Sequence, residues 1–158
     1  MLDLGKIEVM AREALAGDFD AIMTLYKQLH PADPALTAEA DRRVFDSILT
    51  SENFHLLVLE HDQRVVATAY LNVIPNITRS ASPYAVIENV VVDAELRGRG
   101  LGKELMSAVL QRAWRDGCYK AMLMTGSQRE STHGFYRSCG FSGDDKTGYV
   151  ARRCPDNH

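Results

Sequence analysis

Cysteine is scarce in this sequence, and long hydrophobic runs are absent. The three cysteines, Cys118, Cys139 and Cys154, are widely spaced and form no CxxC pair, so we expect reduced thiols and no bound metal. No apolar run reaches the length of about 18 residues that a membrane-spanning helix requires. Residues 1–10 lack a basic segment followed by an apolar one, which disfavours a secretory signal. These absences predict a cytoplasmic protein without a membrane partner.

An excess of positive charge is absent as well. The chain has 18 Lys and Arg against 21 Asp and Glu, for a formal net charge of -3. Non-specific nucleic-acid binding depends on clustered cations, so we expect no nucleic-acid partner. A nucleic-acid protein that uses Arg42, Arg43, Arg97 and Arg99 is the least favoured alternative. With 158 residues, 46% of them hydrophobic, the chain fits one globular domain over residues 1–158.

The pattern of apolar residues predicts a mixed α/β domain with one sheet. Apolar residues at helical spacing predict a helix over residues 18–28 and a second one that begins at Thr37 and includes residues 44–49. Two further helices are predicted over residues 101–116 and 131–139. Runs of apolar and β-branched residues predict strands over residues 7–11, 54–60, 64–74, 84–92, 119–125 and 148–152. Residues 75–83 are rich in Pro, Ser and Asn and are predicted to form a loop, and Gly117 is the predicted C-cap of the long helix.

The most specific local feature is the segment Arg97–Gly102, RGRGLG, between a predicted strand and a predicted helix. Its glycines let backbone N–H groups approach a ligand closely, and the N–H groups that begin a helix are unpaired and partly positive. The segment therefore predicts an anion site, most naturally for phosphate. It is not a P-loop, because Lys103 is followed by Glu104, and it is not a dinucleotide fingerprint, because position 103 is not glycine.

Two motifs then point to a known family. Arg97-x-x-Gly100-x-Gly102 resembles the Q/R-x-x-G-x-G/A signature of the GNAT superfamily of acyl-CoA-dependent N-acyltransferases, and Phe135–Phe141, FYRSCGF, resembles the FYxxxGF segment of that family. The resemblance implies an α/β (α+β) fold: a mixed, mostly antiparallel central sheet flanked by helices, with two central strands splayed for CoA. It also implies transfer of an acetyl group from acetyl-CoA to a primary amine by direct attack in a ternary complex.

The resemblance assigns acetyl-CoA, as co-substrate, to two segments. The pyrophosphate is expected on main-chain amides of the glycine loop, at Arg97, Gly98, Arg99, Gly100, Leu101, Gly102 and Lys103. The pantetheine arm is expected along the strand residues Val90, Val91 and Val92, where an amide of Val90 or Val91 would pair with it or polarise the thioester carbonyl. Such a carbonyl donor is typically worth a rate factor of about 100 or more.

Tyr136 and Glu88 are the predicted catalytic side chains. The resemblance places the Tyr136 hydroxyl near the thioester sulfur, and a tyrosine pKa of about 10 is close enough to a thiol pKa of about 8.5 for proton donation. Glu88 lies in an apolar strand, where burial would raise its pKa and suit it as a base. Many family members carry the acid where this chain has Asn89, and neighbouring strand residues point to opposite faces unless a bulge intervenes. A structural role for Glu88 and a rival base in His133 stay open.

The acceptor amine is less defined. The candidate substrate-binding residues lie in two loops and on neighbouring strands: His30, Asp33, Tyr70, Asn72, Arg79 and Asn89. The segments Ile87–Val92 and Cys118–Lys120 resemble the amino-sugar-phosphate branch of the family, although Ser127–Ser131 lacks an acid expected there. The predicted substrate is a small amine. The alternatives are a peptide or protein amine, a non-catalytic acyl-CoA-sensing module, and a covalent route through Cys139, for which no partner base is evident. A homodimer is common in the family.

Overall fold

A computed structural model describes residues 7–34 and 38–153 of the chain. It divides into two compact units, Met1–Leu123 and Met124–His158. Within the described residues, no helix has the length and apolar character needed to cross a membrane.

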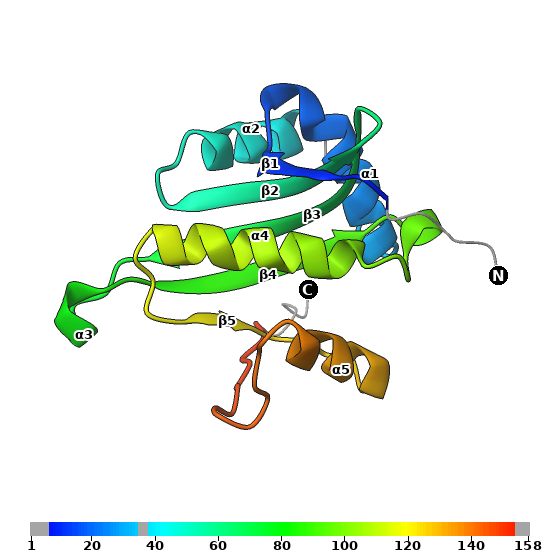
Figure 1. The fold of residues 1–158 in the computed structure, drawn as a ribbon. Helices are drawn as coiled ribbons and strands as arrows, with labels where there is room; N and C mark the ends of the chain where they lie inside the picture. Colours follow the sequence, from blue (N-terminus) through cyan, green and yellow to red (C-terminus); the bar gives the residue numbers. More distant parts are fainter. Residues whose placement is uncertain (1–6, 35–37, 154–158) are drawn as a thin grey trace. The chain divides into compact units, whose positions relative to one another are not determined.

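The first unit is built on one sheet of five strands in the order β1-β2-β3-β4-β5 (Figure 1). The strands are β1 (Met10–Glu13), β2 (Phe54–His61), β3 (Arg64–Ile74), β4 (Tyr84–Val92) and β5 (Ala121–Leu123). The first four strands pair antiparallel, and β5 pairs with β4 in parallel. This confirms the predicted mixed, mostly antiparallel sheet.

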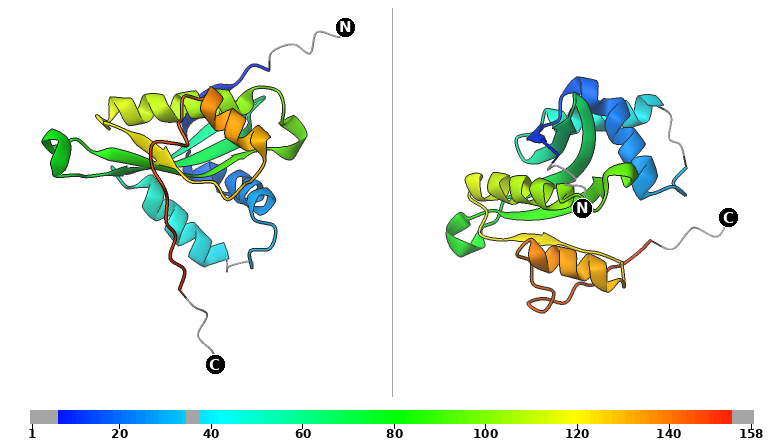
Figure 2. Two further views of the ribbon diagram at one scale, coloured as in Figure 1. Left: turned by 90° about the horizontal axis from the view of Figure 1, so that it is seen from below. Right: turned by 45° about the vertical axis from the view of Figure 1, so that its right-hand side comes forward.

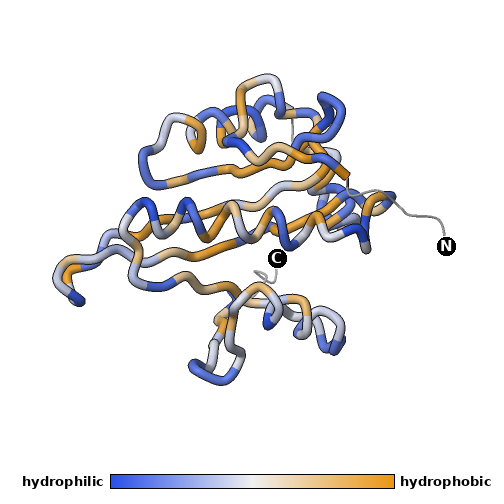
Figure 3. The backbone as a smooth tube through the Cα atoms, in the orientation of Figure 1, coloured by the Kyte–Doolittle hydropathy of each residue, from blue (hydrophilic) through white to orange (hydrophobic). Residues whose placement is uncertain are grey.

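Helices cover both faces of this sheet. Helices α1 (Phe19–Leu29) and α2 (Ala38–Leu49) lie on one face, and α4 (Leu101–Arg115) lies on the other (Figure 2). The core residues under α1 and α2 are Ala14, Ile22, Phe45, Leu56 and Val58. The buried residues of α4 are Leu101, Leu105, Met106, Val109 and Ala113. The strands between these helices are largely hydrophobic (Figure 3), because both of their faces are covered.

Most predicted elements of the first unit are present with small shifts at their ends. The first strand is Met10–Glu13 rather than residues 7–11, because Met10 already pairs with Glu60 near the end of β2 and residues 7–9 lie beyond that pairing. The fifth strand is shorter than predicted because it pairs with β4 only over Ala85–Ile87. Thr37, the predicted cap of the second helix, lies outside the described residues.

Three short elements were not predicted. The turn η1 (Ala16–Asp18) precedes α1, α3 (Thr78–Ala81) lies in the predicted loop 75–83, and η2 (Ala94–Leu96) separates β4 from the glycine loop. Inside α3 the φ angles of Arg79 and Ser80 are +57° and +59°, so this segment is not a regular right-handed helix. The prediction of an irregular connection between β3 and β4 is therefore close to what is found.

The second unit contains the helix α5 (Glu130–Ser138), which agrees with the predicted helix over 131–139. The predicted strand over 148–152 is wrong, because the described residues of that segment form no strand. Tyr149 and Val150 have the composition of a strand but are exposed. Within the described part of this unit there is no other strand for them to pair with, and β-propensity alone does not make a strand.

Candidate functional site

The sheet opens between β4 and β5. Within the described residues, β5 pairs with β4 only at Ala85, Val86 and Ile87, whereas β4 continues to Val92. The Ala85 N–H donates to the Lys120 carbonyl at 2.9 Å, which fixes the side of β4 that faces β5. Beyond Ile87 this side of β4 presents backbone groups with no strand partner among the described residues. We call this stretch, residues 88–92, the open segment of β4.

A β-bulge lies within the open segment. Tyr70 pairs with Glu88 and Thr68 pairs with Val91, so β4 uses one more residue than β3 between these two pairs. Directly paired residues share a face of the sheet, and Glu88 and Val91 therefore face the same side. In a regular strand, residues three apart would face opposite sides. Asn89, inside the bulge, has a φ of +51°, a left-handed conformation that Asn adopts more readily than most residues.

The bulge decides which amides face the open side of β4. The Asp93 N–H donates to the Val66 carbonyl at 2.9 Å, so the backbone of Asp93, and by alternation that of Val91, faces β3. The backbone groups of Val90 and Val92 then face the open side. The Val92 carbonyl is already engaged there, since Arg97 Nε donates to it at 3.1 Å. The Val90 N–H is the first backbone donor on the open side after the bulge.

Several polar side chains gather on the face covered by α1 and α2. Tyr70 is paired with Leu56 on β2 and with Glu88 on β4. Tyr70 and Glu88 therefore lie on the same face of the sheet as Leu56, which belongs to the core under α1 and α2. Glu88 is exposed, which overturns the expectation that this strand would bury its carboxylate. Asn89 reaches the same face, because its side chain lies near enough to the Tyr26 phenol of α1 to lower the pKa of that group. The bulge thus lets two consecutive residues, Glu88 and Asn89, point to one face.

Burial raises the pKa of both tyrosines in this group. The pKa of Tyr26 is raised to about 12, mainly by burial, and the hydrogen bond from Asn89 acts in the opposite direction. The pKa of Tyr70 is also raised by burial, and its ring packs edge-on against Phe54 with centroids 6.1 Å apart. Both hydroxyls are therefore protonated at neutral pH. They can donate and accept hydrogen bonds, but they are poor bases.

The glycine loop has the geometry expected of an anion site. Gly98 and Gly100 have φ angles of +77° and +83°, and Gly100 is the N-cap of α4. The first bond into the helix runs from the Lys103 N–H to the Gly100 carbonyl at 3.1 Å. The N–H groups of Leu101 and Gly102, in the first turn, have no acceptor one turn earlier in the helix. Arg99 and Lys103 are exposed beside these amides.

Helix α1 also contacts the chain between β4 and the glycine loop. The Gln28 side-chain oxygen accepts the Ala94 N–H at 2.9 Å, and the Asp93 carboxylate accepts the Glu95 N–H at 3.0 Å. These two bonds hold the first turn of η2, which leads directly into Arg97. Gln28 of α1 therefore holds the chain just beyond the end of the open segment.

The predicted acceptor-binding residues do not all lie together. Tyr70 and Asn89 lie on one face of the sheet near the bulge, whereas the Asn72 amide is engaged by the Val86 carbonyl at 3.2 Å. His30 and Asp33 are exposed just after α1. Arg79 precedes the start of β4 and lies over the Tyr119 ring at 6.0 Å. Tyr84 and Asn89 are five residue steps apart along β4, which is roughly 16 Å, so Arg79 is remote from the bulge.

Within the second unit, Tyr136 belongs to a compact aromatic group. Its ring centroid is 5.0 Å from that of Phe135 and 6.2 Å from that of Phe141. The Phe141 N–H donates to the Tyr136 carbonyl at 3.1 Å, which closes the turn after α5. His133, the rival base, donates from Nε2 to the Ser127 carbonyl at 2.8 Å. That bond fixes the ring and occupies the Nε2 proton.

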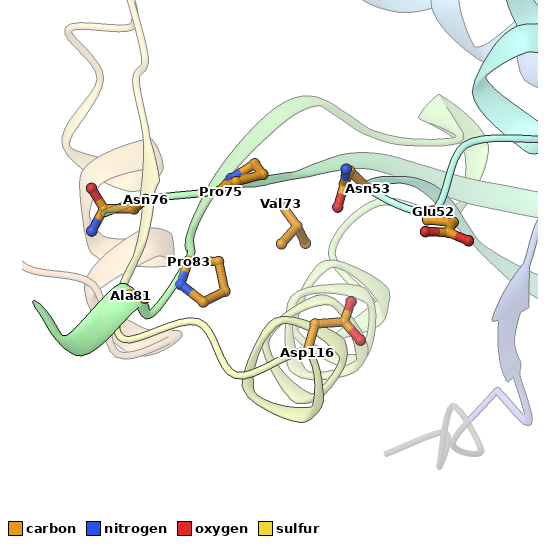
Figure 4. Close-up of a pocket in the computed structure, with 8 residues that line it drawn as sticks. All are labelled: Glu52, Asn53, Val73, Pro75, Asn76, Ala81, Pro83 and Asp116. Carbon is orange, nitrogen blue, oxygen red and sulfur yellow. The ribbon is translucent and has the colours of Figure 1, made fainter. Parts of the chain in front are cut away.

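A pocket of about 430 Å³ lies elsewhere in the first unit (Figure 4). Its lining residues are Glu52, Asn53, Val73, Pro75, Asn76, Ala81, Pro83 and Asp116. They come from the residues just before β2, the end of β3 and the residues after it, the end of α3, the residue before β4 and the residue after α4. The glycine loop lies at the other end of α4, about 22 Å away along the helix axis. The pocket contains none of the predicted catalytic or acetyl-CoA-binding residues.

The sequence did not single out Tyr26 or Gln28. Tyr26 lies within the helix predicted over residues 18–28, where its ring fits the apolar spacing. A signal was present, because a tyrosine at a core position of a helix usually brings its hydroxyl to a polar partner. No comparable signal marks Gln28, whose partner Ala94 lies far along the chain and is identified only by the fold.

Comparisons with known proteins agree with this geometry. A model of the Acetyltransferase (GNAT) family matches residues 19–141. Glucosamine 6-phosphate N-acetyltransferase 1 of Oryza sativa subsp. japonica is 36% identical over 74% of this chain and 70% of its own. Glucosamine 6-phosphate N-acetyltransferase of Trypanosoma brucei brucei is 31% identical over 92% of this chain and 96% of its own. A solved structure from Agrobacterium tumefaciens str. C58 has a TM-score of 0.86 and 40% identity, covering 91% of this chain and 99% of its own.

Proposed function

The chain belongs to the GNAT acetyltransferase family, and on that premise we propose which residues carry out its reaction and which amine it acetylates. The protein is an acetyl-CoA-dependent N-acetyltransferase of small amine substrates. The observation that carries the residue assignments is the combination, in one unit, of a glycine loop at the start of α4 with a strand whose last residues are unpaired on one side.

The pyrophosphate of acetyl-CoA binds the amides that begin α4. This assignment is supported by the left-handed backbone of Gly98 and Gly100. It is also supported by the N–H groups of Leu101 and Gly102, which have no acceptor within the helix, because backbone amides at a helix N-terminus bind phosphate well. Arg99 and Lys103 contribute positive charge, while Arg97 holds the turn through the Val92 carbonyl.

The pantetheine arm runs along the open segment of β4. The strand there offers backbone groups without a strand partner, so an extended amide-containing chain can pair with them as a further strand would. Of the two amides expected to meet the thioester, Val90 is favoured over Val91, because the backbone of Val91 faces β3. The Val90 N–H is the proposed donor to the thioester carbonyl oxygen as negative charge develops on it.

The transfer step moves one proton from the amine and delivers one to the leaving group. The neutral amine nitrogen attacks the thioester carbonyl carbon, the carbon–nitrogen bond forms, and the carbon–sulfur bond breaks. The nitrogen loses one proton to Glu88 through a water molecule, and the leaving thiolate gains one proton from Tyr136. Glu88 is supported as an exposed carboxylate on the face of the bulge, from which it can act through water.

Tyr136 is supported by its motif, FYRSCGF, and by the aromatic packing that fixes its ring. The phenol has a pKa of about 10, and the thiol of CoA has a pKa of about 8.5. The phenol can therefore protonate the leaving sulfur only while negative charge develops on that sulfur next to the hydroxyl. Its loss therefore acts on turnover more than on the binding of either substrate.

The acceptor is proposed to be an amino sugar phosphate, with glucosamine 6-phosphate as the first choice. The support is the names of the two curated relatives and the resemblance of Ile87–Val92 and Cys118–Lys120 to that branch. Tyr70, Asn89, His30 and Asp33 are the proposed contacts, and Asn72 and Arg79 are secondary candidates because of their positions.

A thiol-release assay with acetyl-CoA tests this assignment. The acceptors are glucosamine 6-phosphate, glucosamine, a lysine-containing peptide and an aminoglycoside, each across a range of concentrations. We expect the highest kcat/KM for glucosamine 6-phosphate and a lower value for glucosamine, which lacks the phosphate. A higher kcat/KM for the peptide or the aminoglycoside would refute the acceptor assignment and leave the acetyl-CoA assignments standing.

Three wider assignments complete the proposal. Both units form one N-acetyltransferase domain over residues 1–158, which is supported by a family match that runs across their boundary. The protein acts in the cytoplasm, an assignment supported by Cys118 and Cys139, which form no disulfide. It acts as a homodimer, on the family resemblance alone, and sedimentation at micromolar concentration distinguishes a dimer from a 17.6 kDa monomer.

A further inference from the structure

The loop that follows α1 carries two of the proposed acceptor contacts, His30 and Asp33. It also contains Pro31 and Pro34, which have no N–H group to donate. Within the loop, the Asp33 N–H donates to the His30 carbonyl at 3.2 Å. Residues 31–34 are all exposed, so burial in a core does not hold them. The position of this loop therefore depends on the side chains that reach its backbone.

One side chain of α1 supplies most of the hydrogen bonds to the loop. Lys27 Nζ donates to the Pro31 carbonyl at 3.0 Å and to the Asp33 carbonyl at 3.3 Å. In the described part of the chain, these are two of the three hydrogen bonds that the backbone of residues 31–33 makes. Lys27 forms no ion pair with a carboxylate of the described residues. Its charge is therefore directed at the two carbonyls, and hydrogen bonds from a charged donor are stronger than neutral ones.

Lys27 extends from a fixed part of the fold. Helix α1 is anchored in the core by the buried residues Ile22 and Leu25, and its end is closed by the His30 N–H, which donates to the Tyr26 carbonyl at 2.8 Å. Lys27 lies in the last turn of the helix, where a positive charge is favourable because the carbonyl end of a helix is partly negative. Its ammonium group thus joins an anchored helix to a loop that has little else to hold it.

We propose that Lys27 is a positioning residue for the acceptor: its ammonium group binds the carbonyls of Pro31 and Asp33 and so holds His30 and Asp33 in place for the amine substrate. The inference rests on the proposed acceptor contacts and goes beyond them, because Lys27 is assigned no contact with the acceptor or with acetyl-CoA. A loop that is ordered before binding loses less conformational entropy when the substrate binds. Loss of the ammonium group should therefore weaken acceptor binding and leave the chemical step unchanged.

The kinetic test deletes the ammonium group and keeps the helix. Lys27→Met retains an unbranched side chain of high helix propensity. It should raise the KM of the amine about fivefold, with kcat and the acetyl-CoA KM within about 1.5-fold of the unmodified protein. The amine is whichever acceptor of the thiol-release assay has the highest kcat/KM, so the test does not depend on the identity of the acceptor. A higher KM with an unchanged kcat indicates lost binding and not lost catalysis.

A second lysine provides the control for the lost charge. Lys146 is exposed and forms no hydrogen bond or ion pair within the described residues, and Lys146→Met should leave the amine KM unchanged. An amine KM that stays within about 1.5-fold in Lys27→Met, or that rises equally in Lys146→Met, overturns the proposal. So does an equal rise in the acetyl-CoA KM of Lys27→Met, because that result indicates a general loosening of the fold.

A ligand-free measurement separates this inference from the proposed function. The backbone ¹⁵N relaxation of Ala32 and Asp33 reports the picosecond-to-nanosecond mobility of the loop in the free protein. In Lys27→Met the order parameters of these two amides should fall toward the value of about 0.6 that marks flexible backbone, whereas those of α1 should not change. Such a fall without acetylation of any amine supports the ordering role of Lys27 and shows that only the proposed function has failed. Unchanged order parameters overturn the inference, whatever the enzyme's activity.

Discussion

Among single residues, Gly100 is required for its backbone conformation more than for the absence of a side chain that would clash. A Cβ on Gly100 would meet no heavy atom of the protein within 4 Å, but its φ of +83° strains any β-branched residue. Gly100→Val should raise the acetyl-CoA KM by roughly 100-fold or more, because the strained backbone displaces the Leu101 and Gly102 amides and the added side chain obstructs the phosphate. Steady-state kinetics with varied acetyl-CoA measure this effect.

Gly117 supplies a matched control for that substitution. It follows the other end of α4 and has a φ of +80°, and a Cβ there would likewise meet no heavy atom within 4 Å. Gly117→Val should cost a similar free energy of unfolding, roughly 1–3 kcal/mol, with no comparable change in the acetyl-CoA KM. If both variants raise this KM equally, the effect of Gly100 comes from destabilisation rather than from ligand contact.

The Tyr136 hydroxyl is predicted to act on turnover. Tyr136→Phe keeps the ring that packs against Phe135 and Phe141 and should lower kcat roughly 100-fold, within the range of general acid catalysis, with little change in the amine KM. Tyr149→Phe, in the same unit and 90% exposed, should leave kcat unchanged. Equal kcat values for the Tyr136 variant and the unmodified enzyme would refute the acid role.

At the scale of elements, α1 holds the chain that leads into the glycine loop. Gln28→Met keeps the length of the side chain but removes the oxygen that accepts the Ala94 N–H. The acetyl-CoA KM should rise about threefold, because water can partly replace an exposed hydrogen bond. Gln111→Met on α4, whose amide bonds only Ser107 among the described residues, should leave this KM unchanged. A rise of the same size in both variants would contradict the anchoring role.

A buried ionisable group joins β1, β2 and α4. The His55 side chain is 4% exposed. Its Nδ1 lies 3.4 Å from the Glu13 carboxylate, and its Nε2 lies 3.3 Å from the Asp116 carboxylate. Arg112 forms ion pairs with both carboxylates, at 2.9 Å to Asp116. Burial lowers the pKa of His55 below its ordinary 6.5, and the Asp116 charge acts in the opposite direction. The network fastens the end of α4 to two strands.

This pKa predicts how stability depends on pH. Between the lowered pKa of the folded state and the ordinary value of 6.5, the unfolded chain binds more protons at His55 than the folded chain does. The free energy of unfolding should therefore decrease as the pH falls through this window. Urea unfolding at about pH 7.5 and about pH 5.5 should show a smaller decrease in His55→Gln than in the unmodified protein. An equal decrease in both would exclude His55 as a source.

The elements differ in how far the sequence predicts them. The run Tyr84–Val92 predicts β4 with its observed ends, because a strand buried on both faces has a continuous apolar pattern. The bulge inside β4 is not predictable from the local sequence, since it depends on the pairing with β3. The glycine loop is predictable because its chemistry is local. The exposure of Glu88 is not predictable, because the sequence shows that it lies in a largely apolar strand but not which side chains cover it.

At the scale of the whole molecule, a chain of net charge -3 has to bind an anionic co-substrate. Long-range attraction does not favour this encounter, so affinity has to come from local geometry and from the exposed cations Arg99 and Lys103 beside the loop. Charge on exposed side chains is screened by salt, whereas short hydrogen bonds from main-chain amides are screened much less. The relative weight of the two contributions is measurable.

The amide contribution is predicted to dominate. The double variant Arg99→Gln with Lys103→Gln should raise the acetyl-CoA KM about tenfold or less, well below the effect of Gly100→Val, because exposed charge pairs contribute little in water. Raising the salt concentration from about 50 mM to about 300 mM should increase the KM of the unmodified enzyme more than that of the double variant, because the screened cations are gone. If the double variant instead matches Gly100→Val, or keeps the full salt dependence, binding does not follow this division between amides and side-chain charge.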